Sequence, residues 1–321
     1  MPNSIFKSIP KIFKHNSSFE YMEKIKLTFL GTGSSIPTKQ HNHSAFLINY
    51  KNENILFDCG EGTQRQFRYA ELSPTKITRL FITHWHGDHV LGLPGLLQTL
   101  ALSNYQKTLN IYGPKGTKYF MSKMFETFVF FGKIDIKIHE IHSGKVFENN
   151  DFIIKAEEMI HGAHCLAYSF IEKEKKRLDR KKLKKFKIPN SPIIGELQKG
   201  KDIKLNGKTI KANDVLYNQP GRKVTFILDT RMNNKASEFA KDSDIVIIES
   251  SHASELEDEA YKYNHLTSTQ AATIAKKAKV KALYLTHLSQ RYDHNPSIIE
   301  KQAKKIFKNT KLAKDLDIVE I

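Results

Sequence analysis

Short hydrophobic and β-branched runs recur along the chain and predict strands interleaved with helices. In the first half they predict strands at 25–30, 44–49, 54–57, 79–83, 134–138, 152–156 and 165–171. In the second half they predict strands at 223–228, 244–248 and 282–285. Helical spacing predicts helices at 95–102, 116–128 and 267–279. Because strands and helices interleave in both halves, the pattern indicates an α/β or α+β class with a sheet-rich core.

The main domain is expected to begin near Lys24 and to run to residue 321. The chain has 321 residues and is 40% hydrophobic, enough for one large core or two smaller ones. Residues 1–23 lack a continuous apolar core and are expected to be an extension rather than a signal peptide. No stretch approaches the roughly 20 apolar residues that span a bilayer. With only two cysteines, a reducing cytoplasm is the expected location.

The net charge of +17 is unevenly distributed, and one segment of seventeen residues carries +7 of it. Residues 171–187 hold ten basic side chains against three acidic ones, and Pro and Gly punctuate the stretch that follows. We interpret this as an inserted basic arm at about 171–215. Its charge favours an anionic partner, and nucleic acid is favoured over acidic lipid. Its candidate nucleic-acid-binding residues are Lys173, Lys175, Lys176, Arg177, Arg180, Lys181, Lys182, Lys184, Lys185 and Lys187.

Four ligand-type residues stand together directly after the fourth predicted strand, in the run His84-Trp-His-Gly-Asp-His89. Imidazole and carboxylate are the groups that a hydrolytic zinc site uses, and the thiolates of structural zinc sites are missing. On a loop, His84 and His86 can face one ion while Asp88 and His89 face a second, because the intervening glycine lets the backbone turn. The run therefore predicts the reaction centre of a two-metal hydrolase.

Two ions need further ligands, and polar residues at the ends of other predicted strands qualify by position. Asp229 and His287 directly follow such strands, and His161 follows the apolar-edged stretch Glu157-Glu-Met-Ile160. One aspartate can give an oxygen to each of two ions, so Asp229 is the natural bridging ligand. Asp58 also directly follows a predicted strand. Its position alone does not tell whether it binds a metal ion or orients another ligand.

Taken together, these residues resemble the metal site of the metallo-β-lactamase fold superfamily. Within it, the chain from about Ile25 to Tyr292 resembles the ribonuclease Z family, endonucleases that mature tRNA 3′ ends. Further segments carry the resemblance: Phe29-Leu-Gly-Thr-Gly33, Asp58-Cys-Gly-Glu-Gly-Thr-Gln64, Leu93-Pro-Gly-Leu-Leu97, Ile111-Tyr-Gly-Pro114, Asp229-Thr-Arg231 and Thr286-His-Leu-Ser-Gln-Arg-Tyr292. The resemblance implies a four-layer αββα sandwich with the basic arm inserted into it.

The resemblance also implies two zinc ions. The first would be held by His84, His86 and His161, the second by Asp88, His89 and His287, and Asp229 would bridge them. Asp88 is also expected to orient or deprotonate the attacking water, and Asp58 to orient a ligand histidine. His265, steered by Glu249, is expected to protonate the leaving 3′ oxygen.

On the RNA side, the resemblance implies cleavage that removes the 3′ trailer of precursor tRNA and leaves a 3′ hydroxyl on the tRNA. The arm would clamp the tRNA elbow, commonly in a homodimer in which one subunit's arm serves the other's active site. Two roles stay open for Ser289, Arg291 and Arg231: contact with a phosphate of the RNA, or pairing with other residues of the protein.

The chain departs from the family pattern at one chemically relevant position. The family motif His-Glu-Ala-Thr is matched by Ile248-Glu-Ser-Ser251, which keeps the glutamate and loses the histidine, whereas His265-Leu-Thr267 keeps its imidazole. Manganese or iron could replace zinc at such a site. Two other hypotheses stay open: a hydrolase of the same fold acting on cyclic nucleotides, sulfate esters or thioesters, and a non-catalytic RNA-binding protein.

Overall fold

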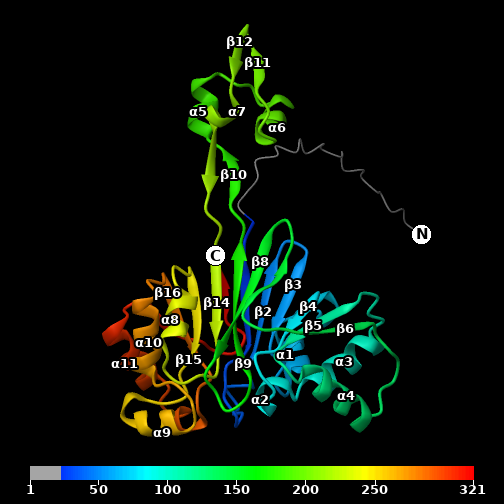
Figure 1. Cartoon of the computed structure of the whole chain (residues 1–321), viewed down its shortest axis with the longest axis vertical. Helices are drawn as coiled ribbons and strands as arrows, with labels where there is room; N and C mark the ends of the chain where they lie inside the picture. Colours follow the sequence, from blue (N-terminus) through cyan, green and yellow to red (C-terminus); the bar gives the residue numbers. More distant parts are fainter. Residues whose placement is uncertain (1–22) are drawn as a thin grey trace, which may run out of the picture.

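The computed structural model describes residues 23–321, in which two seven-stranded sheets lie face to face (Figure 1). The first sheet has the spatial order β18-β1-β2-β3-β4-β5-β6. Its strands are β1 (Lys26–Gly31), β2 (Ala45–Tyr50), β3 (Glu53–Phe57), β4 (Arg79–Phe81), β5 (Leu109–Gly113), β6 (Ile136–Glu140) and β18 (Ile318–Glu320). Strands β18 to β3 pair antiparallel, and β3 to β6 pair parallel.

The second sheet has a related arrangement, with the order β17-β16-β15-β14-β9-β8-β7. Its strands are β7 (Gly144–Glu148), β8 (Phe152–Met159), β9 (Cys165–Glu172), β14 (Lys223–Ile227), β15 (Ile245–Glu249), β16 (Ala282–Thr286) and β17 (Thr310–Leu312). Strands β14 to β17 are parallel, while β7, β8, β9 and β14 pair antiparallel.

Helices cover the outer face of each sheet. On the first sheet they are α1 (Thr63–Tyr69), α2 (Gly87–Val90), α3 (Leu93–Leu102) and α4 (Thr117–Thr127), with a 3-10 turn η1 (Pro74–Lys76). On the second they are α8 (Asn234–Ala240), α9 (Glu257–Lys262), α10 (Ser268–Lys277) and α11 (Ser297–Ile306), with η2 (Ser254–Leu256) and η3 (Gln290–Tyr292). None of the helices within residues 23–321 is long and apolar enough to cross a membrane.

Apolar side chains fill all three interfaces between these layers. Between the sheets, Phe57 of β3 stacks on Phe226 of β14 with ring centroids 4.3 Å apart, within a larger aromatic cluster. Separate apolar clusters lie between each sheet and its helices. Strands covered on both faces are hydrophobic at nearly every position, as in Ile245–Glu249, which is buried throughout. The expected four-layer αββα sandwich is confirmed.

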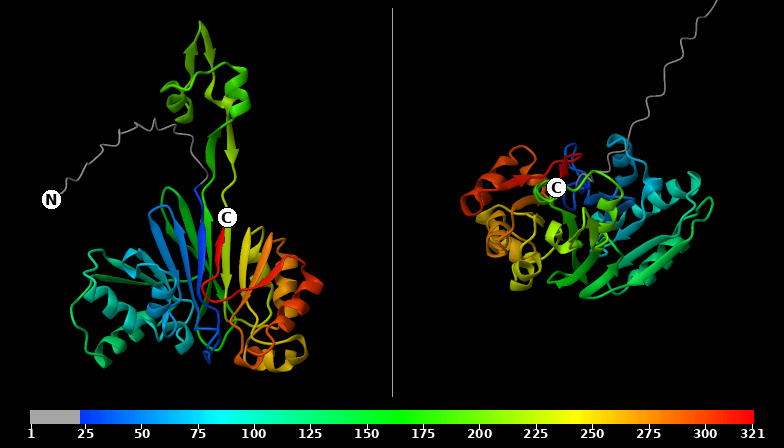
Figure 2. Two further views of the ribbon diagram at one scale, coloured as in Figure 1. Left: turned by 180° about the vertical axis from the view of Figure 1, so that it is seen from behind. Right: turned by 90° about the horizontal axis from the view of Figure 1, so that it is seen from above.

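Between β9 and β14 the chain leaves the sandwich as the arm, residues 173–222 (Figures 1 and 2). Its elements are β10 (Lys175–Leu178), α5 (Arg180–Lys185), α6 (Ile193–Gln198), β11 (Ile203–Leu205), β12 (Lys208–Ile210), α7 (Ala212–Val215) and β13 (Leu216–Gln219). Strands β10 and β13 pair antiparallel and form the stalk. Beyond them the tip has its own small apolar cluster, which includes Leu183, Leu197 and Val215.

The strands and helices predicted from the sequence are confirmed, although their ends shift by a few residues. Strands β5, β7, β17 and β18 and helices α1, α8, α9 and α11 of the sandwich were missed. Most of these elements are only three to seven residues long and therefore show little periodicity. Helix α11 has ten residues and buries Ile299 and Ala303 one turn apart, so its pattern could have been found. The His-rich run was expected on a loop, but α2 begins at Gly87, so Asp88 and His89 lie in a short helix. The expected extension at 1–23 lies outside the described residues except for Glu23.

Candidate metal centre

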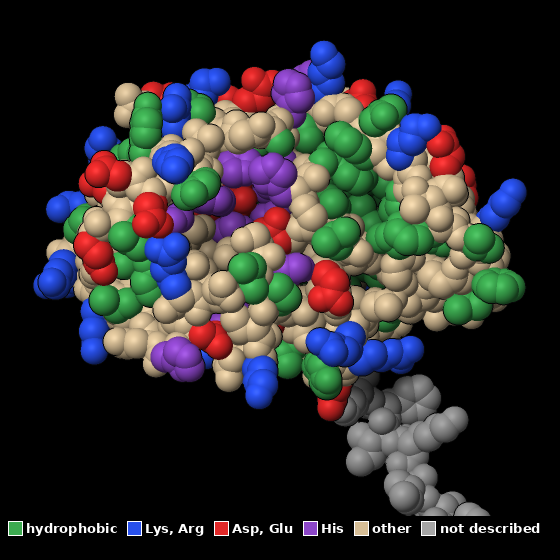
Figure 3. Space-filling view, turned by 90° about the horizontal axis from the view of Figure 1, so that it is seen from below, with side chains coloured by type: hydrophobic (Ala, Val, Ile, Leu, Met, Phe, Trp, Pro, Cys, Tyr) green, Lys and Arg blue, Asp and Glu red, His purple; other side chains and the backbone are tan. Residues whose placement is uncertain are grey.

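Chain segments that follow strands of both sheets meet at the edge of the sandwich opposite to the arm. His84 lies beyond β4 and Asp58 beyond β3 in the first sheet, while His161, Asp229 and His287 lie beyond β8, β14 and β16 in the second. Seen from that edge, histidine side chains line a hollow in the surface (Figure 3). Each sheet therefore supplies part of one site.

Two of these residues have left-handed backbone, with φ of 55° at Asp58 and 58° at His287. Such a conformation costs about 1–3 kcal/mol for a residue other than glycine and persists only where the surroundings hold it. The Asp58 amide donates to the Phe81 carbonyl at 2.8 Å, and the Leu288 amide donates to the Thr32 carbonyl at 3.0 Å. These bonds tie both turns to neighbouring strands.

Two glycines allow the loop after β3 to pack directly on the start of α2 and α3. A Cβ on Gly60 would lie 2.4 Å from the carbonyl oxygen of Asp88, and one on Gly92 would lie 2.1 Å from the carbonyl oxygen of Gly60. The Cys59 amide donates to the carbonyl of His89 at 2.8 Å across this contact. Because no side chain fits there, glycine is required at both positions.

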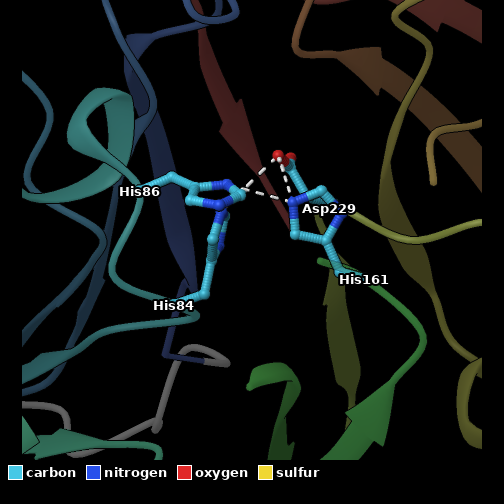
Figure 4. A group of neighbouring side chains, drawn as sticks. All are labelled: His84, His86, His161 and Asp229. Atoms are coloured by element: carbon cyan, nitrogen blue, oxygen red, sulfur yellow. Dashed lines mark hydrogen bonds and ion pairs between the residues drawn. The ribbon is translucent and has the colours of Figure 1, made fainter. Parts of the chain in front are cut away.

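The first ligand-type group contains three histidines and one carboxylate (Figure 4). The ligand atoms of His84, His86, His161 and Asp229 all lie within 4.8 Å of one another. The Nδ1 of His86 lies 3.1 Å from the Nε2 of His161. His86 is exposed, so this group is open to solvent on one side.

The second group is buried and shares Asp229 with the first. It contains Asp88, His89, Asp229 and His287, again with ligand atoms within 4.8 Å of one another. The Nε2 of His287 lies 3.1 Å from Oδ2 of Asp88 and 3.3 Å from the Nε2 of His89. The structure therefore brings together all seven candidate ligands that the sequence singled out.

The two oxygens of Asp229 face different groups. Its Oδ2 lies 3.6 Å from the Nε2 of His84 and 3.6 Å from that of His161. Its Oδ1 lies 3.5 Å from the Nε2 of His89 and 3.2 Å from that of His287. One carboxylate can thus serve two adjacent ions.

Unpartnered polar atoms and charge both fit a cationic occupant. Among the described residues, the buried His84 Nε2 and Asp229 Oδ1 have no hydrogen-bond partner, although buried polar atoms are normally paired. Burial would lower the pKa of His89, but the carboxylates of Asp229, Asp58 and Asp88 outweigh it and raise that pKa well above its usual value. So many buried negative charges require a positive charge among them.

The second ring nitrogen of four of these histidines is held by a fixed partner, as is typical of metal-binding histidines. The pairs are His84 Nδ1 with Thr83 Oγ1 at 3.1 Å, His89 Nδ1 with Asp58 Oδ2 at 2.6 Å, His161 Nδ1 with the Asn264 carbonyl at 3.1 Å and His287 Nδ1 with Ser251 Oγ at 2.8 Å. Asp58 itself accepts from the Thr83 amide at 2.7 Å. Each ring is therefore oriented with Nε2 toward the centre.

His265 and Glu249 form a third group beside His287. The Nδ1 of His265 lies 3.0 Å from Oε1 of the fully buried Glu249. Burial would lower the pKa of His265, but Glu249 and, more weakly, Asp229 raise it to about 9. A pKa raised in this way favours the protonated form of the imidazole at neutral pH.

A cavity of about 750 Å³ connects these groups to solvent and is large enough for a nucleotide-sized ligand. Ser289 and Arg291 line it, and the Arg291 guanidinium pairs with Glu259 at 3.0 Å. Arg231 is not part of its lining, and its guanidinium lies over the Tyr261 ring at 5.3 Å.

The basic residues of the arm divide into two sets. Lys173 and Lys175 lie at its base, where their Nζ atoms pair with Glu148 at 2.6 Å and Glu172 at 2.9 Å. The others lie on the stalk and tip, and six of them are exposed: Lys176, Arg180, Lys181, Lys184, Lys185 and Lys187.

Three residues that hold the Nδ1 atoms of site histidines were not predicted from the sequence: Thr83, Asn264 and Ser251. Asn264 acts through its backbone carbonyl, which leaves no signal in the sequence. Ser251 could have been found, since it occupies the threonine position of the Ile248-Glu-Ser-Ser251 segment. His252, which follows, also lines the cavity and was missed.

Comparison with known proteins yields relatives over nearly the whole chain. Ribonuclease Z of Methanosarcina acetivorans is 37% identical over 300 residues, which cover 92% of this chain and 98% of the relative. The short form of human tRNase Z aligns with a TM-score of 0.66 at 26% identity, covering 92% of this chain and 98% of the human one. The metallo-β-lactamase fold protein YhfI of Bacillus subtilis aligns with a TM-score of 0.69 at 19% identity, covering 94% and 100% of the two chains, which supports the fold. A family model described as anti-Pycsar protein Apyc1 matches residues 25–126.

Proposed function

The chain belongs to the ribonuclease Z family, and we propose that it removes the 3′ trailer of precursor tRNA with a two-zinc centre. Membership in this family makes it a hydrolytic endoribonuclease that processes tRNA 3′ ends by phosphodiester cleavage. The finer parts of the proposal are the identity and number of the ions, the roles of the site residues, the RNA-binding role of the arm and the homodimer.

The observation that carries the metal proposal is the placement of Asp229 between two histidine groups. In this proposal His84, His86 and His161 would hold the first ion, Asp88, His89 and His287 would hold the second, and Asp229 would contribute an oxygen to each. The unpartnered Nε2 of His84 and Oδ1 of Asp229 support it, because both are buried and lack another role. An all-imidazole and carboxylate donor set favours zinc, although manganese or iron also binds such ligands.

When bound, two such ions supply a hydrolytic nucleophile at neutral pH and neutralise charge on the scissile phosphate. Side chains of the protein are proposed to handle the protons of the reaction. Asp88 lines the cavity, which supports its proposed role in orienting the attacking water and accepting its proton. His265 is held through Nδ1 by Glu249, which leaves Nε2 available to protonate the leaving 3′ oxygen of the tRNA.

The arm is proposed to bind RNA by charge and to contribute affinity rather than chemistry. Its exposed lysines and arginines belong to the stalk and tip. Figure 1 shows the arm at the end of the molecule opposite to α2, which carries Asp88 and His89. Polyanions bind such surfaces chiefly through phosphate contacts and release of counterions.

In a homodimer, the arm of one copy could lie close to the site of the other, although arm and site are far apart within one copy. β9 begins at Cys165, whose Sγ donates to the Asp229 carbonyl at 3.2 Å, and it runs eight residues to Glu172 at the base of the arm. At about 3.3 Å per residue, roughly 25 Å therefore separate the site from the base, and the tip is farther still. An arm of one copy can instead reach the RNA that occupies the site of another.

An apolar surface on and beside α3 and α4 offers an interface for such a dimer. Figure 3 shows hydrophobic side chains beside the histidine-lined hollow, on the side of these helices. Val129 is 90% exposed and Phe131 73% exposed. The other large apolar side chains exposed in this segment are Leu102, Tyr119, Phe120, Phe125 and Phe128. Exposed apolar patches of this kind commonly mark protein–protein contacts.

The cytoplasm is the proposed location. Cys59 and Cys165 are both buried and unpaired, which suits a reducing compartment.

Metal analysis combined with a cleavage assay tests the proposal. The purified protein is expected to contain two zinc ions and to cut an unprocessed tRNA transcript once, yielding a tRNA with a 3′ hydroxyl and an intact trailer. Asp229→Asn should abolish cleavage and release metal. Transcripts with and without a CCA end show whether a mature end blocks the reaction. Metal-free protein that binds the transcript and never cuts it would overturn the proposal.

A further inference from the structure

Glu249 contacts more than the proposed proton donor. Its carboxylate is fully buried at the end of β15. Besides His265, it accepts from the backbone amide of Thr230 at 2.8 Å and from the hydroxyl of Ser251 at 2.7 Å. Thr230 directly follows Asp229, so Glu249 holds the loop that carries the shared carboxylate.

Ser251 continues this hydrogen-bonded chain to His287. Its Oγ lies 2.8 Å from the Nδ1 of His287, and Ser251 is only 4% exposed. A hydroxyl has one hydrogen to donate, and Glu249 at 2.7 Å is a nearer acceptor than the carbonyl oxygen of His287 at 3.2 Å. With its hydrogen committed to Glu249, Ser251 must accept a hydrogen from Nδ1 of His287. In a neutral ring the Nε2 of His287 then has no hydrogen, and it faces the carboxylates of Asp88 and Asp229 as a ligand to a cation between them would.

We infer that Ser251 is a positioning residue that sets the tautomer of His287 and, through Glu249, couples this ring to His265. Glu249 thereby supports two histidines with different tasks. His265 bonds to the Glu249 carboxylate directly through Nδ1, whereas His287 is linked to it through the Ser251 hydroxyl. The inference rests on the proposed metal centre, in which His287 is a ligand.

The segment that carries Ser251 is fixed on both sides. The His252 amide donates to the Leu266 carbonyl at 3.3 Å, and the Ser268 amide donates to the His252 carbonyl at 2.9 Å. The Ser250 amide donates to the Thr286 carbonyl at 2.8 Å. The backbone around Ser251 is thus held without its side chain, so removing the hydroxyl should act on His287 rather than on the fold.

The chain offers a matched control one residue away. Ser250 is also fully buried, yet its Oγ has no hydrogen-bond partner among the described residues. Ser250→Ala removes the same atom from the same turn without touching the chain from Glu249 to His287. Ser251→Thr and Ser251→Val form a second pair, because the two side chains have nearly the same shape and differ in the hydroxyl.

Zinc affinity of the full-length protein is the readout, measured by titrating metal-free protein against a chromophoric chelator. Loss of a bond that orients a metal-binding histidine typically weakens metal binding about 10- to 100-fold. Ser251→Val and Ser251→Ala are therefore expected to bind one of the two ions about 10- to 100-fold more weakly. Ser251→Thr and Ser250→Ala should bind both ions with wild-type affinity. Unfolding of each metal-free variant is followed in parallel, so that a loss of fold is recognised.

Two outcomes overturn the inference in distinguishable ways. If the wild-type protein binds two ions and Ser251→Val binds them as tightly as Ser251→Thr, the hydroxyl has no positioning role, and the proposed metal centre stands. If the wild-type protein binds no zinc, the metal centre itself is wrong and the inference falls with it.

Discussion

Two histidines of the centre have their pKa shifted in opposite directions. Burial, helped by His89, lowers the pKa of His84 well below its usual value. The same burial acts on His265, but Glu249 outweighs it and raises the pKa to about 9. An imidazole without a proton can donate a lone pair, whereas a protonated one can donate hydrogen. The different surroundings of these two imidazoles therefore favour opposite protonation states at neutral pH.

His265→Ala is expected to slow precursor tRNA cleavage by about 10²–10⁴-fold, because the 3′ oxygen then leaves without a proton. Hydrolysis of bis(p-nitrophenyl) phosphate should fall far less, since nitrophenolate leaves readily as an anion. Single-turnover rates on both substrates measure the difference. His142→Ala removes an exposed imidazole that does not line the cavity of the site and serves as the control. Equal losses on the two substrates would contradict an acid role for His265.

Glu172 at the base of the arm links several parts of the chain. Its carboxylate accepts from Tyr50, Lys175 and Arg222 at 2.6, 2.9 and 2.6 Å. Arg222 in turn donates to the carbonyls of Glu23 and Ile321. Burial would raise the pKa of Glu172, but these three partners lower it to about 2.

Glu172→Gln is therefore expected to lower the free energy of unfolding at pH 7 by about 2–3 kcal/mol. A carboxylate whose pKa is lower in the folded than in the unfolded state stabilises the fold at pH values above its unfolded-state pKa. This contribution is lost as the pH falls through its folded-state pKa. The difference from wild type should shrink between about pH 4.5 and pH 2. Urea unfolding across this range measures it. Glu148→Gln, which breaks exposed pairs only, should change little. A difference that stays constant with pH would refute the argument.

At the scale of elements, the arm is a unit with its own contacts. Its stalk pairs β10 with β13, and its tip packs around Leu183, Leu197 and Val215 without help from either large sheet. Because the metal-site residues lie beyond the other ends of the strands, changes on the tip should leave the site undisturbed.

Replacing Lys184, Lys185 and Lys187 by Gln is expected to weaken RNA binding and flatten its dependence on salt. The slope should decrease by roughly 0.7 log units for each single-strand phosphate that the variant no longer neutralises, and somewhat more for duplex RNA. Titrations at several salt concentrations measure both quantities. The same change at Lys276, Lys277 and Lys279, which are exposed beside α10, is the control for net charge. An identical effect of both triple variants would mean that the arm has no special role.

At the scale of the whole molecule, the two sheets contribute to the centre jointly. The His84–His89 run belongs to the first sheet, and His161, Asp229 and His287 belong to the second. Packing of the sheets through the cluster around Phe57 and Phe226 therefore sets the distances between ligand-type atoms. The arm leaves the sandwich at the opposite edge. Whether one RNA contacts the arm and the site of the same copy, or of two copies, therefore depends on how the copies assemble.

Mixing two inactive variants distinguishes action within a subunit from action between subunits. One variant carries Asp229→Asn and keeps its arm. In the other, Lys175 is joined to Gln219, its directly paired partner, by a two-residue Asn-Gly turn in place of 176–218. If the arm serves the partner's site, refolding them together restores tRNA cleavage to a fraction of the wild-type rate. The armless variant alone should still hydrolyse bis(p-nitrophenyl) phosphate. A mixture that stays inactive would show that arm and site act within one copy.

The sequence by itself determined the identity of the ligand-type residues and the strands that carry them. Local alternation predicts a strand, and a polar residue beyond its end is visible without a structure, as at Asp229 and His287. The charge of the arm was equally plain, because it depends on composition alone. The family resemblance extended this to the four-layer fold.

Only the tertiary structure decided how these residues face one another. That the two oxygens of Asp229 point to different histidine groups depends on the packing of two sheets, which involves residues far apart in the sequence. The hydrogen bonds of His161 with the Asn264 carbonyl and of His287 with Ser251 depend on loop conformations that no periodicity encodes. The direction of the arm follows from sheet topology, which places its base at the strand ends opposite to the site. Long-range packing, rather than local pattern, sets these geometries.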